Sequence, residues 1–331
     1  MSTLMEREAR EASARIAEQL VQNETRVREL CAKLQQIKPR FFQLVGRGSS
    51  DHAGVFAKYL LEIETGIPVV SAAPSVATVY KRRLQLNDAV VLVLSQSGRS
   101  PDIVTQAEMA KASGAYVVAL VNDAESPLAQ TANFVLPLAV GPEKAVAATK
   151  SYLATLSALL QLTAHLSGNQ ALQNALQQLP AQLTAAAQAP TQLRADDLRD
   201  IDRLVVLSRG LGFAIAKEMA LKMKEVCGIQ AEAFSSAEFL HGPVALAHGE
   251  LTVIDAEIRD EALAAHQQKI HDVKARGAKI ISLQQSIADV HPRLAPLLLL
   301  QRFYIDIAHV AVARGHNPDQ PVGLKKVTET L

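Results

Sequence analysis

The sequence predicts an α/β protein built from two tandem domains, each a doubly wound parallel sheet between layers of helices (an αβα sandwich), with an N-terminal helix in front. Short apolar runs alternate with helical segments, and these runs are apolar throughout rather than at every second position. The second half of the chain also repeats landmarks of the first. At 331 residues, the chain exceeds what a single hydrophobic core usually holds.

The N-terminal segment and the first half supply the clearest elements. Residues 4–37 are charged, rich in Ala and Leu and free of Gly and Pro, so they predict one long amphipathic helix. Further helices are expected near residues 51–64, 101–112 and 145–166. The predicted strands between them are Phe41–Val45, Ile67–Ser71, Ala89–Leu94, Tyr116–Val121 and Phe134–Leu136.

The second half begins again with an apolar run, Leu204–Ser208, after a polar Gln- and Ala-rich stretch. Phe42–Gly48 resembles Leu204–Gly210, which lies 162 residues further on. Gly66-Ile67 is matched by Gly228-Ile229 at the same offset. A duplicated unit explains both matches, with chance similarity of short loops as the alternative. The predicted division is a helix at 1–39, a first domain at 40–166, a connection at 167–200, a second domain at 201–316 and a tail at 317–331.

Composition excludes several classes of protein. With 49% hydrophobic residues, 20% charged residues and a net charge of +1, the chain is globular and has no basic surplus for nucleic acid. Cys31 and Cys227 lack metal or redox spacing and are expected to be free thiols in a reducing compartment. Early charges argue against a signal peptide, and no apolar run of the roughly 18 residues that span a membrane is evident. We therefore expect a cytoplasmic protein.

A polar loop follows the third predicted strand and precedes Pro101, a residue typical of a helix start. The N-terminal N–H groups of such a helix have no intrahelical partner and favour an anion. Simple capping of the helix by Ser100 is the alternative. Because the nucleotide-binding glycine motifs are missing, a small phosphorylated metabolite is the expected ligand. The loop residues are Ser95, Gln96, Ser97, Gly98, Arg99 and Ser100.

A second polar turn, Gly46–Asp51, follows the first predicted strand. Ligands of open parallel sheets lie outside the carboxyl ends of the strands, so both turns can contact one ligand. Capping of the next helix by Ser50 or Asp51 is the alternative. In the second half, the strand Leu251–Asp255 is followed by Ala-Glu-Ile-Arg, without serine or glycine. Only the first half is therefore expected to bind phosphate.

Titratable residues gather in the second half. Glu218, Lys222 and Glu225 lie at i, i+4 and i+7 of a predicted helix, Phe213–Cys227, and so share one face. A solvated stripe of charges is the alternative. His241 precedes Gly-Pro in a loop or at the end of a short helix, where it is either a proton carrier or a surface residue. The Pro- and Gly-containing tail would ordinarily be a fraying end.

Four ordered motifs resemble the sugar isomerase (SIS) family, and in particular the isomerase region of glucosamine-6-phosphate synthase, which is a tandem pair of SIS domains. The likeness extends from about residue 40 to the C-terminus. The motifs are specific for the family and less so for the reaction. They are the loop from Ser95 to Gly98, the helix segment Ala220–Glu225, the run from Ala231 to Pro243, and the tail from Asp319 to Lys326.

The resemblance implies roles for individual residues. The phosphate would be held by Ser95, Gln96, Ser97 and Ser100. Ser50 would contact the sugar chain, and the backbone of Val146 would contact the ligand. The resemblance further implies a homodimer and a small phosphorylated sugar as ligand. The proton transfer itself requires no metal, the sequence shows no His, Asp and Glu ligand cluster, and no cofactor is expected.

The catalytic residues implied by the resemblance lie in the second half. Glu225 matches the base that moves a proton between C1 and C2, and His241 matches the histidine that opens the sugar ring from the neighbouring subunit. Lys326 matches the lysine that closes over the sugar, and Lys222 matches a lysine of the same pocket. One carboxylate close to both carbons and a nearby cation are what the proton transfer requires.

Departures from the synthase guide the choice of reaction. The sequence begins with a helix where the synthase has a glutaminase domain, and we therefore expect no built-in ammonia source. A glucosamine-6-phosphate deaminase of the SIS type is the favoured interpretation. Arg99 replaces an acidic residue of the synthase, and Val322-Gly323 replaces its Arg-Asn, which puts the contacts near Lys326 in doubt.

The sequence is also compatible with other functions. A fructosamine-6-phosphate deglycase, a galactosamine-6-phosphate deaminase and a plain aldose–ketose isomerase would use the same phosphate loop. A sugar-phosphate sensor is the non-enzymatic alternative. However, the N-terminal 40 residues or so are too few and too rich in Glu for a DNA-binding module, and a sensor would not need Glu225, His241 and Lys326 together.

Overall fold

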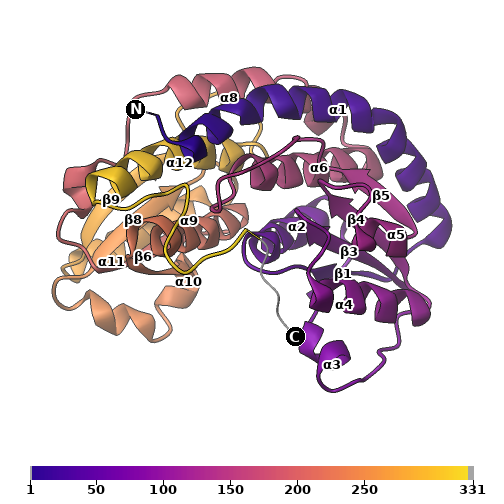
Figure 1. Ribbon diagram of the computed structural model, residues 1–331. Coiled ribbons are helices and arrows are strands. Elements are labelled where there is room, and N and C mark those ends of the chain that lie inside the picture. Colours follow the sequence, from indigo (N-terminus) through magenta and orange to yellow (C-terminus); the bar gives the residue numbers. More distant parts are fainter. Residues whose placement is uncertain (1, 327–331) are drawn as a thin grey trace. The chain divides into compact units, whose positions relative to one another are not determined.

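The computed structural model describes residues 2–326 and divides into two compact units, each built on one parallel sheet (Figure 1). The first-sheet unit comprises residues 14–143, 150–177 and 325–326 of the described chain. The second-sheet unit comprises residues 2–13, 144–149 and 178–324. The predicted α/β class with two parallel-sheet domains and an N-terminal helix is confirmed. The boundaries proposed from the sequence stay predictions, and residues 327–331 of the predicted tail lie outside the described residues.

The first-sheet unit contains a five-stranded parallel sheet in the order β2-β1-β3-β4-β5. Helix α1 (Leu4–Ile37) contributes its residues from Ala14 onward. The strands are β1 (Phe41–Val45), β2 (Val69–Ser71), β3 (Ala89–Ser95), β4 (Tyr116–Val121) and β5 (Phe134–Pro137). The helices are α2 (Ser49–Thr65), α3 (Pro74–Thr78), α4 (Pro101–Ala112), α5 (Pro127–Thr131), α6 (Lys150–Leu166) and α7 (Gln170–Leu176).

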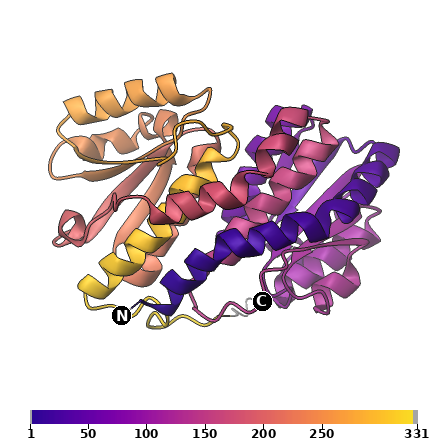
Figure 2. The ribbon, with the colours of Figure 1, turned by 90° about the horizontal axis from the view of Figure 1, so that it is seen from above.

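The core of this unit explains why its strands are apolar throughout. Every residue of β3 is buried, because helices cover both faces of the sheet. On one face, Val91 and Val93 pack with Ile103 and Ala107 of α4. Helix α2 covers the other face and packs on α6. Helix α1 runs alongside α6, where the buried Gln19 donates to the carbonyl of Ala154 (Figure 2).

The second-sheet unit contains a four-stranded parallel sheet in the order β7-β6-β8-β9. Its strands are β6 (Arg203–Ser208), β7 (Gln230–Ser235), β8 (Thr252–Glu257) and β9 (Lys279–Gln284). Its α-helices are α8 (Leu179–Gln188), α9 (Leu211–Cys227), α10 (Ser236–Phe239), α11 (Leu263–Ala275) and α12 (Ala295–Ala313), with 3-10 turns η1 (Ala195–Leu198) and η2 (Pro243–Ala247).

Helix α12 is the one described helix that is long and apolar enough to cross a membrane by length and composition. Within it, 89% of the apolar window is buried inside the protein, and Arg302 and Asp306 form a buried ion pair of 2.7 Å. A helix buried in a protein core can be as long and as apolar as a membrane span, so α12 is weak evidence for a membrane. The two cysteines, Cys31 and Cys227, are buried free thiols, and burial raises the pKa of each to about 12.

The duplication predicted from the sequence is visible in the backbone. Helices α2 and α9 have equal lengths, and both ends are offset by 162 residues. Gly48 (φ 52°, ψ −127°) and Gly210 (φ 58°, ψ −130°) precede them in nearly the same conformation. The strand order β2-β1-β3-β4 is also that of β7-β6-β8-β9. Chance similarity does not explain agreement in both dihedral angles and sheet order.

Among the element boundaries that differ from those predicted, the starts of α6 and β2 have a clear physical cause. Helix α6 begins at Lys150 rather than at 145, because the backbone of the preceding residues is bound elsewhere: Glu8 accepts hydrogen bonds from the N–H groups of Lys144 and Ala145. Strand β2 begins at Val69 rather than at Ile67, because Gly66 ends α2 in a left-handed conformation and Pro68 has no N–H to donate.

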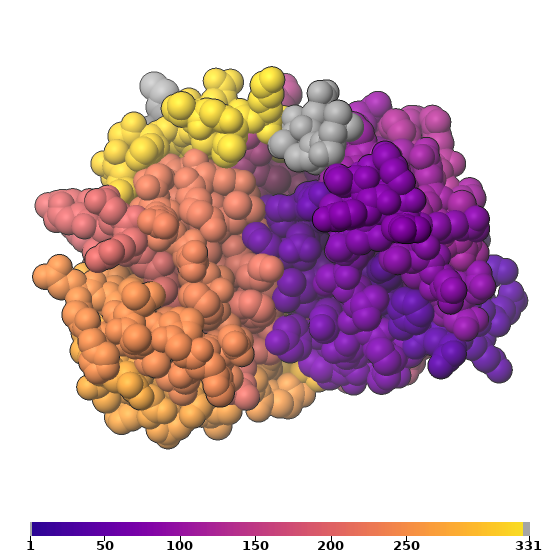
Figure 3. All heavy atoms as spheres, turned by 90° about the horizontal axis from the view of Figure 1, so that it is seen from below, coloured from indigo at the N-terminus to yellow at the C-terminus, as the bar shows by residue number. Residues whose placement is uncertain are grey.

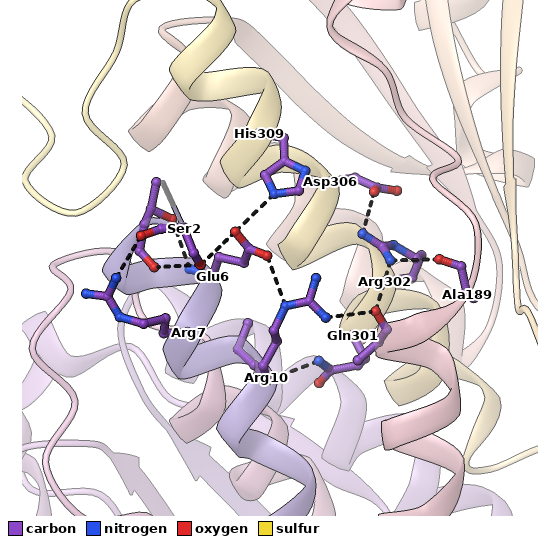
Figure 4. Close-up of polar contacts among 12 residues, drawn as sticks. Ser2, Glu6, Arg7, Arg10, Ala189, Gln301, Arg302, Asp306 and His309 are labelled. Atoms are coloured by element: carbon purple, nitrogen blue, oxygen red, sulfur yellow. Dashed lines mark hydrogen bonds and ion pairs between the residues drawn. The ribbon is translucent and has the colours of Figure 1, made fainter.

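The start of α1 and the chain after α12 are held together within the second-sheet unit. Glu6 accepts hydrogen bonds from Ser2 and Arg10 and lies 3.0 Å from His309 of α12 (Figure 4). Asp319 accepts from the N–H groups of Leu4 and Met5, which are among the orphan donors of the α1 N-terminus. The alternative of a fraying end is therefore wrong for this part of the tail.

Candidate functional site

The first sheet reverses its strand order between β1 and β3, and the two polar turns predicted to bind the ligand follow these two strands. Strands β1 and β3 are hydrogen-bonded neighbours, so their carboxyl ends lie side by side. Such a switch point is where open α/β sheets bind their ligands. The structure thus brings the turn after Val45 and the loop after Ser95 to the same place.

The loop after β3 is shaped by Gly98. This residue has φ +63°, and a Cβ atom built on it would lie only 2.2 Å from the hydroxyl oxygen of Ser126. The loop is fixed by hydrogen bonds from Gly98 N to Ser95 Oγ, from Leu128 N to Gly98 O, and from Asn122 N to Gln96 O. Only glycine fits this position without moving the loop.

The capping alternatives for both turns are wrong. Ser100 stands at the N-cap of α4 in an extended conformation, but its side chain makes no capping hydrogen bond. The N-cap of α2 is Gly48, and neither Ser50 nor Asp51 occupies that position. Among the described residues, the hydroxyls of Ser50 and Ser100 have no hydrogen-bond partner, so both are available to a ligand.

These groups line one cavity of about 310 Å³ in the first-sheet unit. The N-terminus of α4 lies at this cavity and its positive dipole end favours an anion there, and the cavity has a size suited to a small anion such as a sugar phosphate. All the predicted phosphate residues and Lys326 belong to it. The lining residues are Arg47, Gly48, Ser50, Leu94, Ser95, Gln96, Ser97, Ser100, Ile103 and Lys326.

Lys326 is held at this cavity by a buried carboxylate. Its ammonium nitrogen lies 3.4 Å from Oε2 of Glu143, whose side chain is fully buried. The same carboxylate accepts hydrogen bonds from the hydroxyl (2.5 Å) and the N–H (3.2 Å) of Ser151 at the start of α6. Figure 3 shows the C-terminal segment that leads to Lys326, in yellow, at the molecular surface.

The second-sheet unit contains a buried ionic cluster on α9. Lys222 Nζ lies 2.6 Å from Glu225 Oε2 and 3.3 Å from Glu218 Oε1, and Tyr304 of α12 donates to Glu218. The side chains of Glu218 and Lys222 are 0% and 1% exposed, and that of Glu225 is 20% exposed. The alternative of a solvated stripe is therefore wrong.

Electrostatics keep Lys222 charged. Burial acts to lower the pKa of its ammonium group, but the adjacent carboxylates of Glu218 and Glu225 outweigh burial and raise the pKa above its ordinary value. Lys222 is thus a fixed cation at neutral pH. Glu225 bonds it through Oε2 alone, and Oε1 has no partner among the described residues. That oxygen can accept a proton.

The other two predicted residues lie elsewhere in the second-sheet unit. His241 is exposed two residues after the end of α10, and its N–H donates to the carbonyl of Glu238. Val146 lies in the segment before α6, and its N–H donates to the carbonyl of Asp319. The backbone N–H of Val146 is therefore engaged, while the predicted contact with ligand stays a prediction.

Sequence reasoning missed Arg47, Asp102 and Glu143. Asp102 is buried in the first turn of α4, where an acidic residue is ordinary and gives no signal of its own. Glu143 lies in a loop, and nothing in its spacing indicates burial. Arg47 could have been noted as a cation between two glycines at the end of a strand.

Comparisons with known proteins agree with this geometry. The model of the SIS domain family matches residues 37–165 and 197–295, which is more than half of the chain. The chain therefore belongs to the SIS domain family, in two copies of the domain. Its described residues contain no group of three or more His, Cys, Asp or Glu side chains that could hold a metal ion.

Among curated proteins, the chain is 36% identical over 216 residues to glutamine–fructose-6-phosphate aminotransferase (isomerizing) of Symbiobacterium thermophilum. The match covers 61% of this chain and only 35% of that protein. A solved structure of a proposed phosphosugar isomerase from Silicibacter pomeroyi is 36% identical, with a TM-score of 0.89, and covers 96% of this chain and 100% of that one.

A second solved structure supports the fold alone. The C-terminal domain of glucosamine-fructose-6-phosphate aminotransferase from Francisella tularensis is 23% identical, with a TM-score of 0.84. The match covers 97% of this chain and 99% of that one. Within the SIS family, the chain thus resembles the isomerase part of the aminotransferases and the phosphosugar isomerases.

Proposed function

We propose that the protein is a glucosamine-6-phosphate deaminase, which isomerises glucosamine 6-phosphate and hydrolyses the product to fructose 6-phosphate and ammonia. The proposal rests on the cavity at the switch point of the first sheet. There, serine hydroxyls that make no capping hydrogen bond, a helix N-terminus and Lys326 converge. Such a set of hydroxyl donors, with the cations Arg47 and Lys326 in the same lining, suits the monoester phosphate of a small sugar.

The proton transfer falls to Glu225. His241 opens the sugar ring, and Glu225 Oε1 then removes the proton from C2 of the open-chain aldehyde while O1 takes a proton from water, which forms an enaminol. Glu225 returns its proton to C1, and the nitrogen gives one proton back to the hydroxide left by that water, which leaves an imine at C2. Water adds to C2, ammonia leaves, and the ketone of fructose 6-phosphate remains. One carboxylate suffices because it loses at C1 the proton that it gained at C2.

The cations support this chemistry. Lys222 orients the Glu225 carboxylate through a 2.6 Å hydrogen bond and leaves its other oxygen open. Lys326 offers positive charge where negative charge develops on the substrate oxygen. The reaction as written needs only substrate and water and calls for no metal or cofactor.

The names of the relatives support the substrate class. The aminotransferases act, as their name says, on fructose 6-phosphate, which is the sugar product of the proposed reaction. The chain spans only 35% of the length of the aminotransferase from Symbiobacterium thermophilum. A cytoplasmic homodimer in which His241 serves the neighbouring subunit's site completes the proposal.

One assay separates the candidate reactions. The protein is mixed with glucosamine 6-phosphate, and ammonia and fructose 6-phosphate are measured. Release of both in equal amounts is the expected result. If neither appears and fructosamine 6-phosphate is consumed, the deaminase proposal is wrong and the protein is a deglycase. Preference for galactosamine 6-phosphate would identify a deaminase for that epimer, isomerisation without ammonia would identify a plain isomerase, and binding without turnover would identify a sensor.

A further inference from the structure

We propose that Arg47 is a phosphate-binding residue of the cavity in the first-sheet unit, held in place by the buried carboxylate of Asp102. The inference rests on the proposed function for the nature of the anion, the phosphate of a phosphosugar. It adds a charged residue to the serine set that the sequence predicted.

The geometry of Arg47 points to a ligand. Its Nε donates to Oδ2 of Asp102 at 2.8 Å, and this is the bond that fixes the guanidinium. Its two terminal nitrogens have no partner among residues 2–326. The Arg47 side chain is 53% exposed and belongs to the cavity lining, together with Ser50 and Ser100. A guanidinium presents its terminal N–H groups as a planar fork that matches two oxygens of a phosphate.

Asp102 explains why this helix N-terminus needs an arginine beside it. Its side chain is 1% exposed, and its other oxygen accepts from the N–H of Ile103 in the first turn of α4. A buried carboxylate in that turn repels any anion at the same helix N-terminus, and it would weaken phosphate binding if it stood alone. Arg47 neutralises this charge through Nε and offers its remaining N–H groups to the ligand.

The turn that carries Arg47 is tightly fixed to the site. A Cβ atom on Gly46 would lie 2.7 Å from the carbonyl carbon of Ser50, so the chain can pass there only with glycine. The carbonyl of Arg47 accepts from the N–H of Ser50, which joins the backbone of the arginine to the first turn of α2. Arg47 and Ser50 are therefore joined through the backbone of this turn.

Arg99 provides a matched control within the same unit. It is also 53% exposed and pairs with an aspartate, Asp123, at 2.6 Å, but it is not among the residues that line the cavity. The proposal requires that the two arginines behave differently although their own exposure is the same and each pairs with an aspartate, which is buried for Arg47 and 38% exposed for Arg99.

The test measures binding of inorganic phosphate and of fructose 6-phosphate by calorimetry to the full chain and its variants. Arg47→Gln should weaken both by about 10- to 100-fold, the effect of losing charged hydrogen bonds, and Arg47→Lys should weaken both less. Arg99→Gln should change neither by more than about twofold. Thermal unfolding of each variant reports whether it is folded.

A double variant separates ligand contact from charge neutralisation alone. If Arg47 only neutralised Asp102, Arg47→Gln combined with Asp102→Asn would bind as tightly as the original protein, and that recovery would overturn the proposal. Equal losses in the Arg47→Gln and Arg99→Gln variants, or an original protein that binds neither probe, would also overturn it. If binding depends on Arg47 but the protein releases no ammonia, the deaminase proposal is wrong and the proposal for Arg47 stands.

Discussion

Lys222 Nζ lies 2.6 Å from the carboxylate of Glu225 and 3.3 Å from that of Glu218, so that one buried cation serves two acids. The cation is nearly inaccessible to solvent, and its neighbours raise its pKa above the ordinary value. Both carboxylates therefore depend on Lys222 for charge compensation, and its removal leaves the two acids without this cation.

Replacement of Lys222 by Met should destabilise the protein strongly. Two carboxylates would lose their cation in a buried place, which typically costs about 3–5 kcal/mol in the free energy of unfolding. Urea unfolding at pH 7 measures the loss. The double variant Glu218→Gln with Lys222→Met should regain part of it, because one of the stranded charges is removed. A single variant as stable as the original protein would show that the cluster contributes nothing.

Replacement of Glu225 by Gln should abolish turnover and spare binding. The amide keeps the shape of the side chain but cannot accept the proton, so kcat for ammonia release should fall by about 100- to 10,000-fold. Calorimetry with fructose 6-phosphate should give a dissociation constant close to that of the original protein. Glu108, an exposed glutamate on α4, gives the matched control as Glu108→Gln. Turnover that is unchanged in Glu225→Gln would remove this residue from the mechanism.

Much of the fold could be predicted from the sequence because its signals are local. Helix α1 has the predicted bounds, since an uninterrupted amphipathic pattern ends before Pro39. Strands β1 and β4 also have the predicted bounds, as runs of apolar residues buried on both faces. The start of α6 could not be predicted, because the helix-forming residues 145–149 are held outside it by contacts with Glu8 and Asp319, which are remote in sequence.

The candidate site, too, has features that could be predicted from the sequence and features that could not. The polar loop after β3 could be predicted because its residue types and its place after a strand are local features. Burial of Glu218 and Lys222 could not, because the same spacing describes a solvated stripe and a buried cluster. The pairing of Arg47 with Asp102 joins residues 55 positions apart, and only the packing of the turn after β1 against the start of α4 brings them together.

Replacement of Gly98 by Ala should weaken phosphosugar binding by at least about tenfold. The new Cβ would meet the side chain of Ser126, at 2.2 Å from its oxygen and 2.7 Å from its Cβ, so the loop must move. The left-handed conformation adds a cost of about 1–2 kcal/mol. Gly141→Ala is the control, because Gly141 has φ +65° and open space around its Cβ position. The two variants share the backbone strain, so equal affinities for fructose 6-phosphate would refute a specific role for the loop.

Replacement of Glu143 by Gln should affect both stability and KM. Glu143 is a buried acceptor for Ser151 and Lys326, and loss of its charge should cost about 1–3 kcal/mol in the free energy of unfolding. Because Lys326 would be less firmly held, KM for glucosamine 6-phosphate should rise. Lys326→Met should reduce turnover, and it should also lower the free energy of unfolding because the buried Glu143 carboxylate loses this cation. If KM stays constant in Glu143→Gln, the position of Lys326 does not depend on this carboxylate.

Stability at acid pH should depend on Glu6. Burial acts to raise the pKa of Glu6, but its hydrogen bonds from Arg10, His309 and Ser2 outweigh burial and lower the pKa below its ordinary value (Figure 4). A carboxyl group with a lowered pKa in the folded state stabilises the protein fully above the unfolded-state pKa, about 4.3 for Glu, and loses this contribution as the pH falls through the folded-state pKa.

The comparison of Glu6→Gln with the original protein tests this dependence. At pH 7 the variant should be less stable by about 1–3 kcal/mol, since charged hydrogen bonds are lost in a nearly buried place. The difference should shrink below about pH 4, because the original protein then loses the same charge. Urea unfolding between pH 3 and 7 measures both curves, with the exposed Glu29→Gln on the same helix as the control. A difference that stays constant down to pH 3 would show that Glu6 acts through its shape and not through its charge.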